Sequence, residues 1–156
     1  MKKLSITFTT ILLALGCFSL SPAMQAGGVV PADGGHSIVG LWKVTYYLPG
    51  NVELFTTYDQ WHSDGLEFEV NGAAPGAVCQ GTWQNAPHGS VKLFHVVWLF
   101  DAQGAPSGHI EEIQINTVGH DHNTYTGTFD QKFYDLNGNL TGEATGTVSA
   151  TRLTVP

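Results

Sequence analysis

The chain has 156 residues, 42% of them hydrophobic, which is enough for one domain and no more. Six Lys and Arg stand against thirteen Asp and Glu, for a formal net charge of −7. So acidic a surface repels phosphate backbones and anionic lipids, and we expect no nucleic-acid partner.

Residues 1–26 predict a secretory signal peptide. A short basic start, "MKK", precedes the apolar run "ITFTTILLALGCFSL" and the small residues "SPAMQA", with cleavage expected after Ala26. The run is too short for a stable membrane span. We therefore expect export to the periplasm or secretion. The alternative is a lipoprotein, because "LALGC" resembles a lipobox in which Cys17 would be lipidated.

Residues 27–37 are rich in glycine and predict a flexible leader. From residue 38 onward, strand-like runs alternate with turns that contain Gly, Asn, Asp or Pro. The predicted strands are 38–48, 52–62, 66–70, 77–84, 90–100, 109–118, 124–135 and 140–153. Every connection is short, so chain neighbours should be antiparallel neighbours. The domain 38–156 is thus predicted to be all-β, an eight-stranded antiparallel up-and-down β-barrel.

Alternation along each strand predicts which side chains face the barrel interior. In 124–135 and 140–153, the Thr-rich face is expected outside. In 66–70, Glu67 and Glu69 are expected outside, with Leu66, Phe68 and Val70 inside.

The same reasoning on 109–118 expects its most polar face in solvent. The side chains expected outside are Glu112, Gln114 and Asn116. Those expected inside are His109, Glu111, Ile113 and Ile115.

The strand 90–100 is apolar on both faces. Because Lys92 more comfortably faces water, we place His95 inside. The residues Phe94, Val96 and Trp98 then form an outer apolar stripe, which predicts a homo-oligomer.

The sequence "GLW", Gly40 to Trp42, opens the first barrel strand, and Arg152 lies near the end of the last. This pairing resembles the signature of lipocalins and other calycin barrels. The resemblance implies that Trp42 plugs the closed end and that Arg152 packs across it as a structural cation–π pair. A short exported barrel also resembles the allene-oxide-cyclase and dirigent type, whose members bind or steer small apolar molecules.

The candidate acid–base residues are His95, His109 and Glu111. An imidazole beside a carboxylate in an apolar lumen has a pKa shifted toward neutrality, which suits proton transfer on a carbonyl or enol. Two alternatives remain: a mutually satisfied buried pair, or a pair that only recognises a ligand.

Two turn regions hold further polar side chains. In "DQWHSDG", the residues Asp59, His62 and Asp64 fit either turn chemistry or a polar anchor for a ligand at a barrel rim. In "GHDHN", His120 and His122 could approach one metal, but a His-x-His pair is a weak signal and an exposed polar turn is favoured. The sequence predicts no metal site and no cofactor. After cleavage Cys79 would be the remaining cysteine, expected as a small buried hydrophobe.

The sequence predicts an exported barrel that holds a small apolar or aromatic molecule in its lumen. The alternative is an isomerase, cyclase or lyase that uses a His–Glu pair inside the lumen. The expected ligand-contacting residues are Tyr46, Tyr58, Phe68, Trp83, Phe129, Gln131 and Phe133.

Overall fold

The computed structural model describes residues 37–72, 74 and 76–156. The expected signal peptide, 1–26, and all but the last residue of the expected leader, 27–37, lie outside the described residues. In the part of the chain that is described, no helix is long and apolar enough to cross a membrane.

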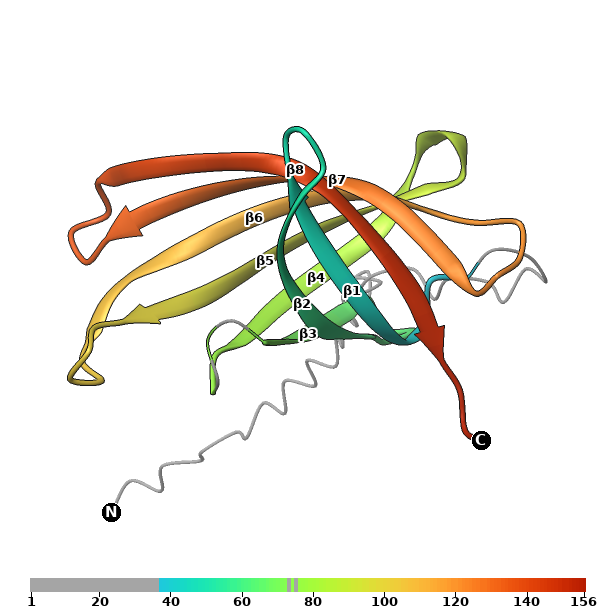
Figure 1. Ribbon diagram of the computed structural model, residues 1–156, viewed down its shortest axis with the longest axis horizontal. Helices are drawn as coiled ribbons and strands as arrows, with labels where there is room; N and C mark the ends of the chain where they lie inside the picture. Colours follow the sequence, from blue (N-terminus) through green and yellow to red (C-terminus); the bar gives the residue numbers. More distant parts are fainter. Residues whose placement is uncertain (1–36, 73, 75) are drawn as a thin grey trace, which may run out of the picture.

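Eight strands form one closed antiparallel barrel in chain order, which confirms the predicted fold class (Figure 1). The strands are β1 (Gly40–Leu48), β2 (Val52–Trp61), β3 (Leu66–Asn71), β4 (Val78–Ala86), β5 (Ser90–Phe100), β6 (Pro106–Val118), β7 (Thr124–Asp135) and β8 (Leu140–Leu153). A short 3₁₀ turn, η1 (Pro87–Gly89), joins β4 to β5. β8 closes the barrel against β1, with Val44 opposite Ala150.

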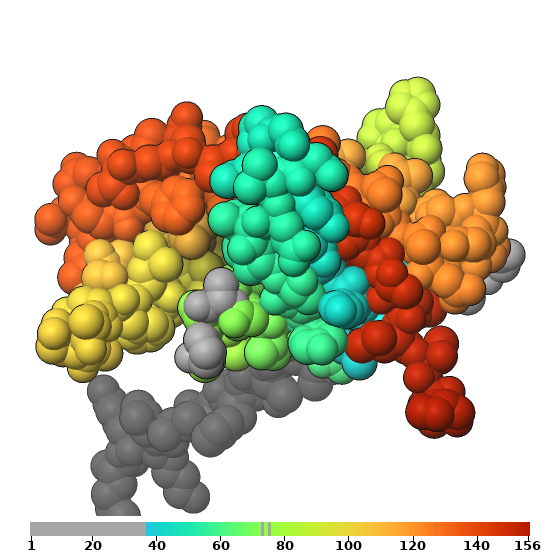
Figure 2. Space-filling model, in the orientation of Figure 1, coloured from blue at the N-terminus to red at the C-terminus, as the bar shows by residue number. Residues whose placement is uncertain are grey.

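The β1–β2 hairpin turns sharply, which its sequence explains. Gly50 and Asn51 adopt φ values of 84° and 63°. Gly takes this left-handed conformation without a steric penalty, and Asn takes it more readily than most residues. Figure 2 shows this hairpin, in teal, standing on the viewer's side of the molecule with β8, in red, beside it.

Trp42, near the start of β1, is fully buried. The Trp42 indole donates to the Ile38 carbonyl at 2.7 Å, and the Arg152 guanidinium lies 4.1 Å from the Trp42 ring centroid. Arg152 also donates to the carbonyl oxygens of Val39 and His122. One cation thereby ties β8 to the residues before β1 and to the β6–β7 turn.

A buried aromatic cluster lies next to Trp42. The Tyr125 ring packs edge-on against Trp42 at 4.9 Å and against Trp61 at 6.1 Å, and Trp61 packs against Trp83 at 5.9 Å. Aromatic pairs at these separations add to the stability that burial provides.

The predicted faces of β3 are wrong. Glu67 and Glu69 are buried, whereas Leu66 and Val70 are exposed and Phe68 is half-buried on the opposite face from the two carboxylates. The prediction assumed that carboxylates meet water. In this barrel they meet other polar groups inside.

The predicted faces of β6 are wrong for the same reason. Glu112, Gln114 and Asn116 are buried, while Ile113 and Ile115 are each 40% exposed. Ile113 and Ile115 therefore belong to an apolar outer surface rather than to the core.

The predicted faces of β5 are confirmed. His95 is 3% exposed and points inside, while Phe94, Val96 and Trp98 are exposed on the outside. Phe94 lies opposite Ile113 on the neighbouring strand, so the outer apolar stripe spans β5 and β6.

Candidate functional site

A cavity of about 160 Å³ lies inside the barrel, toward the end opposite Trp42. Its lining comes from the starts of β2 and β6 and the ends of β5 and β7, together with β3 and β4. The apolar lining residues are Leu54, Phe55, Val97, Ile110 and Phe133. The polar lining residues, which we call the floor, are Glu69, Asn71, Cys79, His95, Glu112 and Gln131. The cavity thus has apolar walls over a polar floor.

His95 lies between two carboxylates. Its Nδ1 is 3.2 Å from Glu67 Oε2, and its Nε2 is 3.3 Å from Glu112 Oε1. An imidazole that carries a proton on both nitrogens can donate to both carboxylates at once.

Gly81 on β4 makes room for this arrangement. A Cβ atom at Gly81 would lie 2.6 Å from His95 Cβ and 2.8 Å from Glu67 Oε2. Any side chain at this position would therefore clash with His95 and with the Glu67 carboxylate.

A hydrogen-bond network connects Glu112 to Glu69. The Tyr46 hydroxyl lies 2.8 Å from Glu69 Oε2 and 3.1 Å from Glu112 Oε1, and Gln114 Nε2 donates to Tyr46 and Glu112. Gln131 donates to the other oxygen of Glu112. A hydroxyl has one proton, so Tyr46 donates to one of the two carboxylates at a time.

The imidazole of His95 carries the positive charge of the floor. Burial by itself would lower the pKa of His95, but the charge of Glu112 and the hydrogen bonds to Glu112 and Glu67 raise it well above its ordinary value. Burial would raise the pKa of Glu112, but His95 and the donors of Gln131 and Gln114 lower it. His95 and Glu112 therefore form a buried ion pair at neutral pH.

The remaining interior carboxyls hold their protons more tightly. Burial raises the pKa of Glu69 to about 7, with Glu112 adding to the effect and His95 and Tyr46 opposing it. Burial also raises the pKa of Glu67, against the hydrogen bond from His95. Near neutral pH, Glu69 therefore exists in both protonation states.

Asp59 belongs to the interior and not to a rim. It is fully buried, and its Oδ2 accepts a hydrogen bond of 2.9 Å from the Tyr125 hydroxyl. Burial, with Glu69 and Glu67 nearby, raises the pKa of Asp59 well above its ordinary value. The other two polar residues of that region remain close to the turn: Asp64 accepts from the Leu66 backbone, and the His62 carbonyl accepts from the Trp83 indole.

Two of the expected acid–base residues lie on the outside, so their expected place in the lumen is wrong. His109 and Glu111 are partly exposed, with His109 Nε2 at 3.9 Å from Glu111 Oε1. The His109 ring stacks on Tyr134 at 5.0 Å and meets Trp98 at 6.1 Å. The interior neighbour of His95 on β6 is Glu112, since His95 and Glu112 are register partners.

The expected ligand-contacting residues divide into three groups. Gln131 and Phe133 line the cavity. Tyr46, Trp83 and Phe129 are buried in the interior without lining it. Tyr58 is 51% exposed, and it and Phe68 point away from the lumen. The expected interior position of Phe68 is therefore wrong.

Sequence reasoning missed Glu67, Glu69 and Glu112 as interior residues and treated Cys79 as core packing alone. A signal for Glu112 was present in the β5–β6 hairpin, because the partners of an antiparallel pair point to the same side of the sheet. With His95 inside, the register of β6 against β5 decides whether Glu111 or Glu112 faces the interior, and a shift of one residue exchanges the two.

The "GHDHN" turn is organised by its aspartate. Asp121 Oδ1 accepts hydrogen bonds from the backbone of Asn123 and from the backbone and hydroxyl of Thr124. His120 and His122 are both exposed. This is the exposed polar turn that the sequence favoured.

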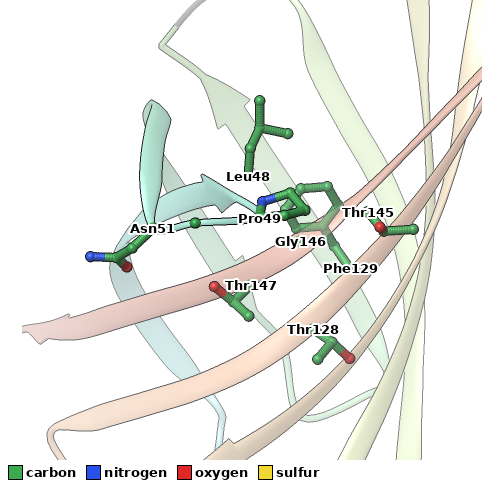
Figure 3. A pocket seen from close by; sticks show the side chains of 9 residues that line it. Leu48, Pro49, Asn51, Thr128, Phe129, Thr145, Gly146 and Thr147 are labelled. Atoms are coloured by element: carbon green, nitrogen blue, oxygen red, sulfur yellow. The ribbon is translucent and has the colours of Figure 1, made fainter.

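A second, more open groove of about 410 Å³ lies where the β1–β2 turn meets β7 and β8. Figure 3 shows Leu48, Pro49 and Asn51 of that turn near Thr128, Thr145 and Thr147. None of its lining residues titrates or binds metals strongly. The chemistry of the interior is therefore concentrated in the cavity that contains His95.

No family model, curated protein or solved structure matches this chain. The fold is established as a closed eight-stranded barrel, and any functional assignment depends on the geometry of the interior.

Proposed function

We propose that the barrel binds a small molecule in the cavity above His95, with an apolar body and one hydroxyl or amine group. The observation that carries this proposal is the arrangement of the lining. Leu54, Phe55, Val97, Ile110 and Phe133 supply apolar walls, and the floor supplies carboxylate acceptors. Ligand sites typically combine mainly apolar walls with a few polar groups that fix orientation.

The size and charge of the cavity narrow the ligand class. At about 160 Å³ it is smaller than the 300–1,000 Å³ that is typical of drug-sized ligands, so the ligand is small. Glu69 and Glu112 disfavour a negatively charged ligand, because a buried anion without a positive partner is costly. The ligand class is therefore neutral or cationic.

Ligand binding is tested with a substitution that fills the cavity. A panel of small phenols, alcohols and amines is titrated into the full chain and followed by NMR. Val97→Phe, which adds bulk at the cavity wall, should abolish the shifts of floor residues. Val96→Phe, on the outer face of the same strand, is the matched control and should leave them unchanged. Equal effects of the two substitutions would exclude binding in this cavity.

A second proposal is that the same floor catalyses proton transfer, in an isomerase, cyclase or lyase reaction. The observation that favours it is that Glu69, with a pKa of about 7, and the charged His95 both line the cavity. A base whose pKa lies near the working pH is well placed to accept a proton from carbon. Glu69 would take that proton, while the positive charge of His95 would stabilise the carbonyl oxygen as it gains negative charge.

Deuterium exchange tests this second proposal. A panel of small ketones and aldehydes in D₂O is followed by NMR for deuterium incorporation next to the carbonyl. The full chain should accelerate exchange, and Glu69→Gln should remove the acceleration while ligand shifts persist. An acceleration that survives Glu69→Gln would contradict the assigned base.

A further inference from the structure

The interior of the barrel has more hydrogen-bond acceptors than the buried donors satisfy. Among the described residues that are buried, the carboxylates Asp59, Glu67, Glu69 and Glu112 accompany a single basic side chain, His95. Glu67 is fully buried, and its Oε1 has no hydrogen-bond partner among the described residues. Buried polar atoms normally have partners, and buried charges are paired or bind metals. The interior is therefore suited to a cation.

Three of the floor residues converge as metal ligands. Glu69, Cys79 and His95 each offer one ligand atom, and these atoms all lie within 4.8 Å of one another. They come from three consecutive strands, β3, β4 and β5, and Glu69 and Cys79 are register partners. Ligand atoms around a tetrahedral zinc ion are separated by about 3.5 Å, given metal–ligand distances of ~2.0–2.3 Å. Small side-chain movements would bring the three atoms to that separation.

Glu67 has the position of a supporting residue for such a site. Metal-binding histidines usually donate their other ring N–H to a carboxylate, which fixes the orientation of the ring. Glu67 Oε2 lies 3.2 Å from His95 Nδ1, which leaves Nε2 as the ligand nitrogen. Glu112 Oε1, 3.3 Å from Nε2, lies beside the position that a metal would occupy.

We propose that Glu69, Cys79 and His95 bind one zinc-class divalent cation, with the remaining coordination position directed into the cavity. The mixed carboxylate, thiolate and imidazole set suits this class of metal. All three side chains line the cavity, so a small molecule there would reach the ion. Binding requires the Cys79 thiolate, the free lone pair of His95 Nε2 and the ionised Glu69 carboxylate. The protons of Cys79 and of His95 Nε2, and that of Glu69 where it is protonated, are released to solvent without any change of oxidation state.

This inference goes beyond the proposed function, because a cation can bind these three residues whether or not an organic molecule enters the cavity. If small molecules bind the chelator-treated chain and no metal binds, the proposed function stands and the metal site does not. If metal binds and no small molecule does, the metal site stands and the proposed function does not.

The test uses cobalt(II) as a spectroscopic probe for zinc. The full chain, freed of metal with a chelator, is titrated with Co²⁺ at neutral pH. One equivalent should produce a thiolate-to-cobalt charge-transfer absorption, and Zn²⁺ should remove it by displacement. Cys79→Ala should abolish the absorption and weaken Zn²⁺ binding at least tenfold. Glu67→Gln should keep the absorption and weaken binding by about 10–100-fold, as expected for a supporting residue.

Glu111→Gln is the matched control, because it removes a partly exposed carboxylate that lies outside the cluster. It should leave both the absorption and the affinity unchanged. No absorption in the unmutated chain overturns the proposal, and so does an absorption that survives Cys79→Ala.

If circular dichroism shows that Cys79→Ala is unfolded, alkylation of the unmutated chain decides the question. Zn²⁺ should slow alkylation of Cys79, measured by peptide mass spectrometry. Equal alkylation rates of Cys79 with and without Zn²⁺ would overturn the proposal.

Discussion

His95 depends on charges that approach it from both sides. Glu112 faces Nε2 and Glu67 faces Nδ1, and both carboxylates are buried. Breaking a buried pair by removing one charge leaves the other charge uncompensated, which typically costs about 3–5 kcal/mol. The residues around His95 should therefore be much less tolerant of change than their neighbours on the outer face.

Glu112→Gln should destabilise the chain by about 3 kcal/mol at neutral pH, because it leaves His95 without its main counter-charge. Urea unfolding measures the change in the free energy of unfolding. Glu111→Gln, one residue away and partly exposed, is the control and should change it by less than about 0.5 kcal/mol. If Glu111→Gln were the more damaging substitution, the register of β6 would be wrong.

Gly81→Ala should also destabilise the barrel, by about 1–3 kcal/mol, because the added methyl group would lie 2.6 Å from His95 Cβ. A thermal melt compares it with Gly76→Ala. At Gly76 an added Cβ meets nothing within 4 Å, so any loss there comes from its positive φ alone. A melting temperature for Gly81→Ala equal to that of the parent chain would contradict the close contact.

For the strands, the pairing between neighbours determines more of the site than the alternation of polar and apolar residues along each strand does. The sequence located all eight strands and placed His95 and Gln131 inside, because turn residues and strand lengths are local signals. It placed Glu67, Glu69 and Glu112 outside, because alternation alone does not say which face is polar in a barrel with a polar interior. Glu112 follows only once β6 is paired with β5, and that pairing depends on the whole barrel.

The outer stripe of β5 and β6 is proposed as a contact between two copies of the chain. Phe94, Trp98 and Ile113 are at least 40% exposed on adjacent strands. An exposed apolar patch of this kind marks an association surface. Phe94→Glu should shift the mass measured by light scattering toward a monomer. Thr126→Glu, on the exposed face of β7, should not. A parent chain that is monomeric at all concentrations would contradict the proposal.

At the scale of the whole molecule, the buried carboxyls should make the metal-free barrel more stable in mild acid than at neutral pH. The folded-state pKa of Glu69 is about 7, above its ordinary value of 4.5. Between pH 4.5 and 7, Glu69 is therefore protonated in the folded state and ionised in the unfolded state. Stability from Glu69 is thus lost as pH rises from about 4.5 to 7, by about 3 kcal/mol. Asp59 and Glu67 have raised pKa values and act in the same direction.

His95 and Glu112, which lie among these carboxyls, limit the pH range in which the barrel is most stable. His95 has a raised pKa, so its contribution is complete below pH 6.5 and is lost as pH rises through the folded-state pKa. Glu112 has a lowered pKa, so its contribution is lost as pH falls below 4.5. Stability should therefore be highest near pH 5.

Denaturation midpoints in the presence of a chelator, measured at about pH 5 and pH 8, test this expectation. The midpoint should be lower at pH 8, and Glu69→Gln should reduce the difference. Glu53→Gln, at the exposed start of β2, should leave it unchanged. A parent chain more stable at pH 8 than at pH 5 would contradict the buried, protonated state of these carboxyls.

The barrel encloses a charged His95 between Glu67 and Glu112 at the floor of its cavity. NMR of the imidazole nitrogens during a pH titration tests this arrangement directly, with His95→Gln providing the assignment. His95 should keep protons on both nitrogens well above its ordinary pKa of 6.5, with both protons protected from solvent. A His95 that loses a proton near pH 6.5, or whose ring protons exchange freely with water, would contradict this buried, charged arrangement.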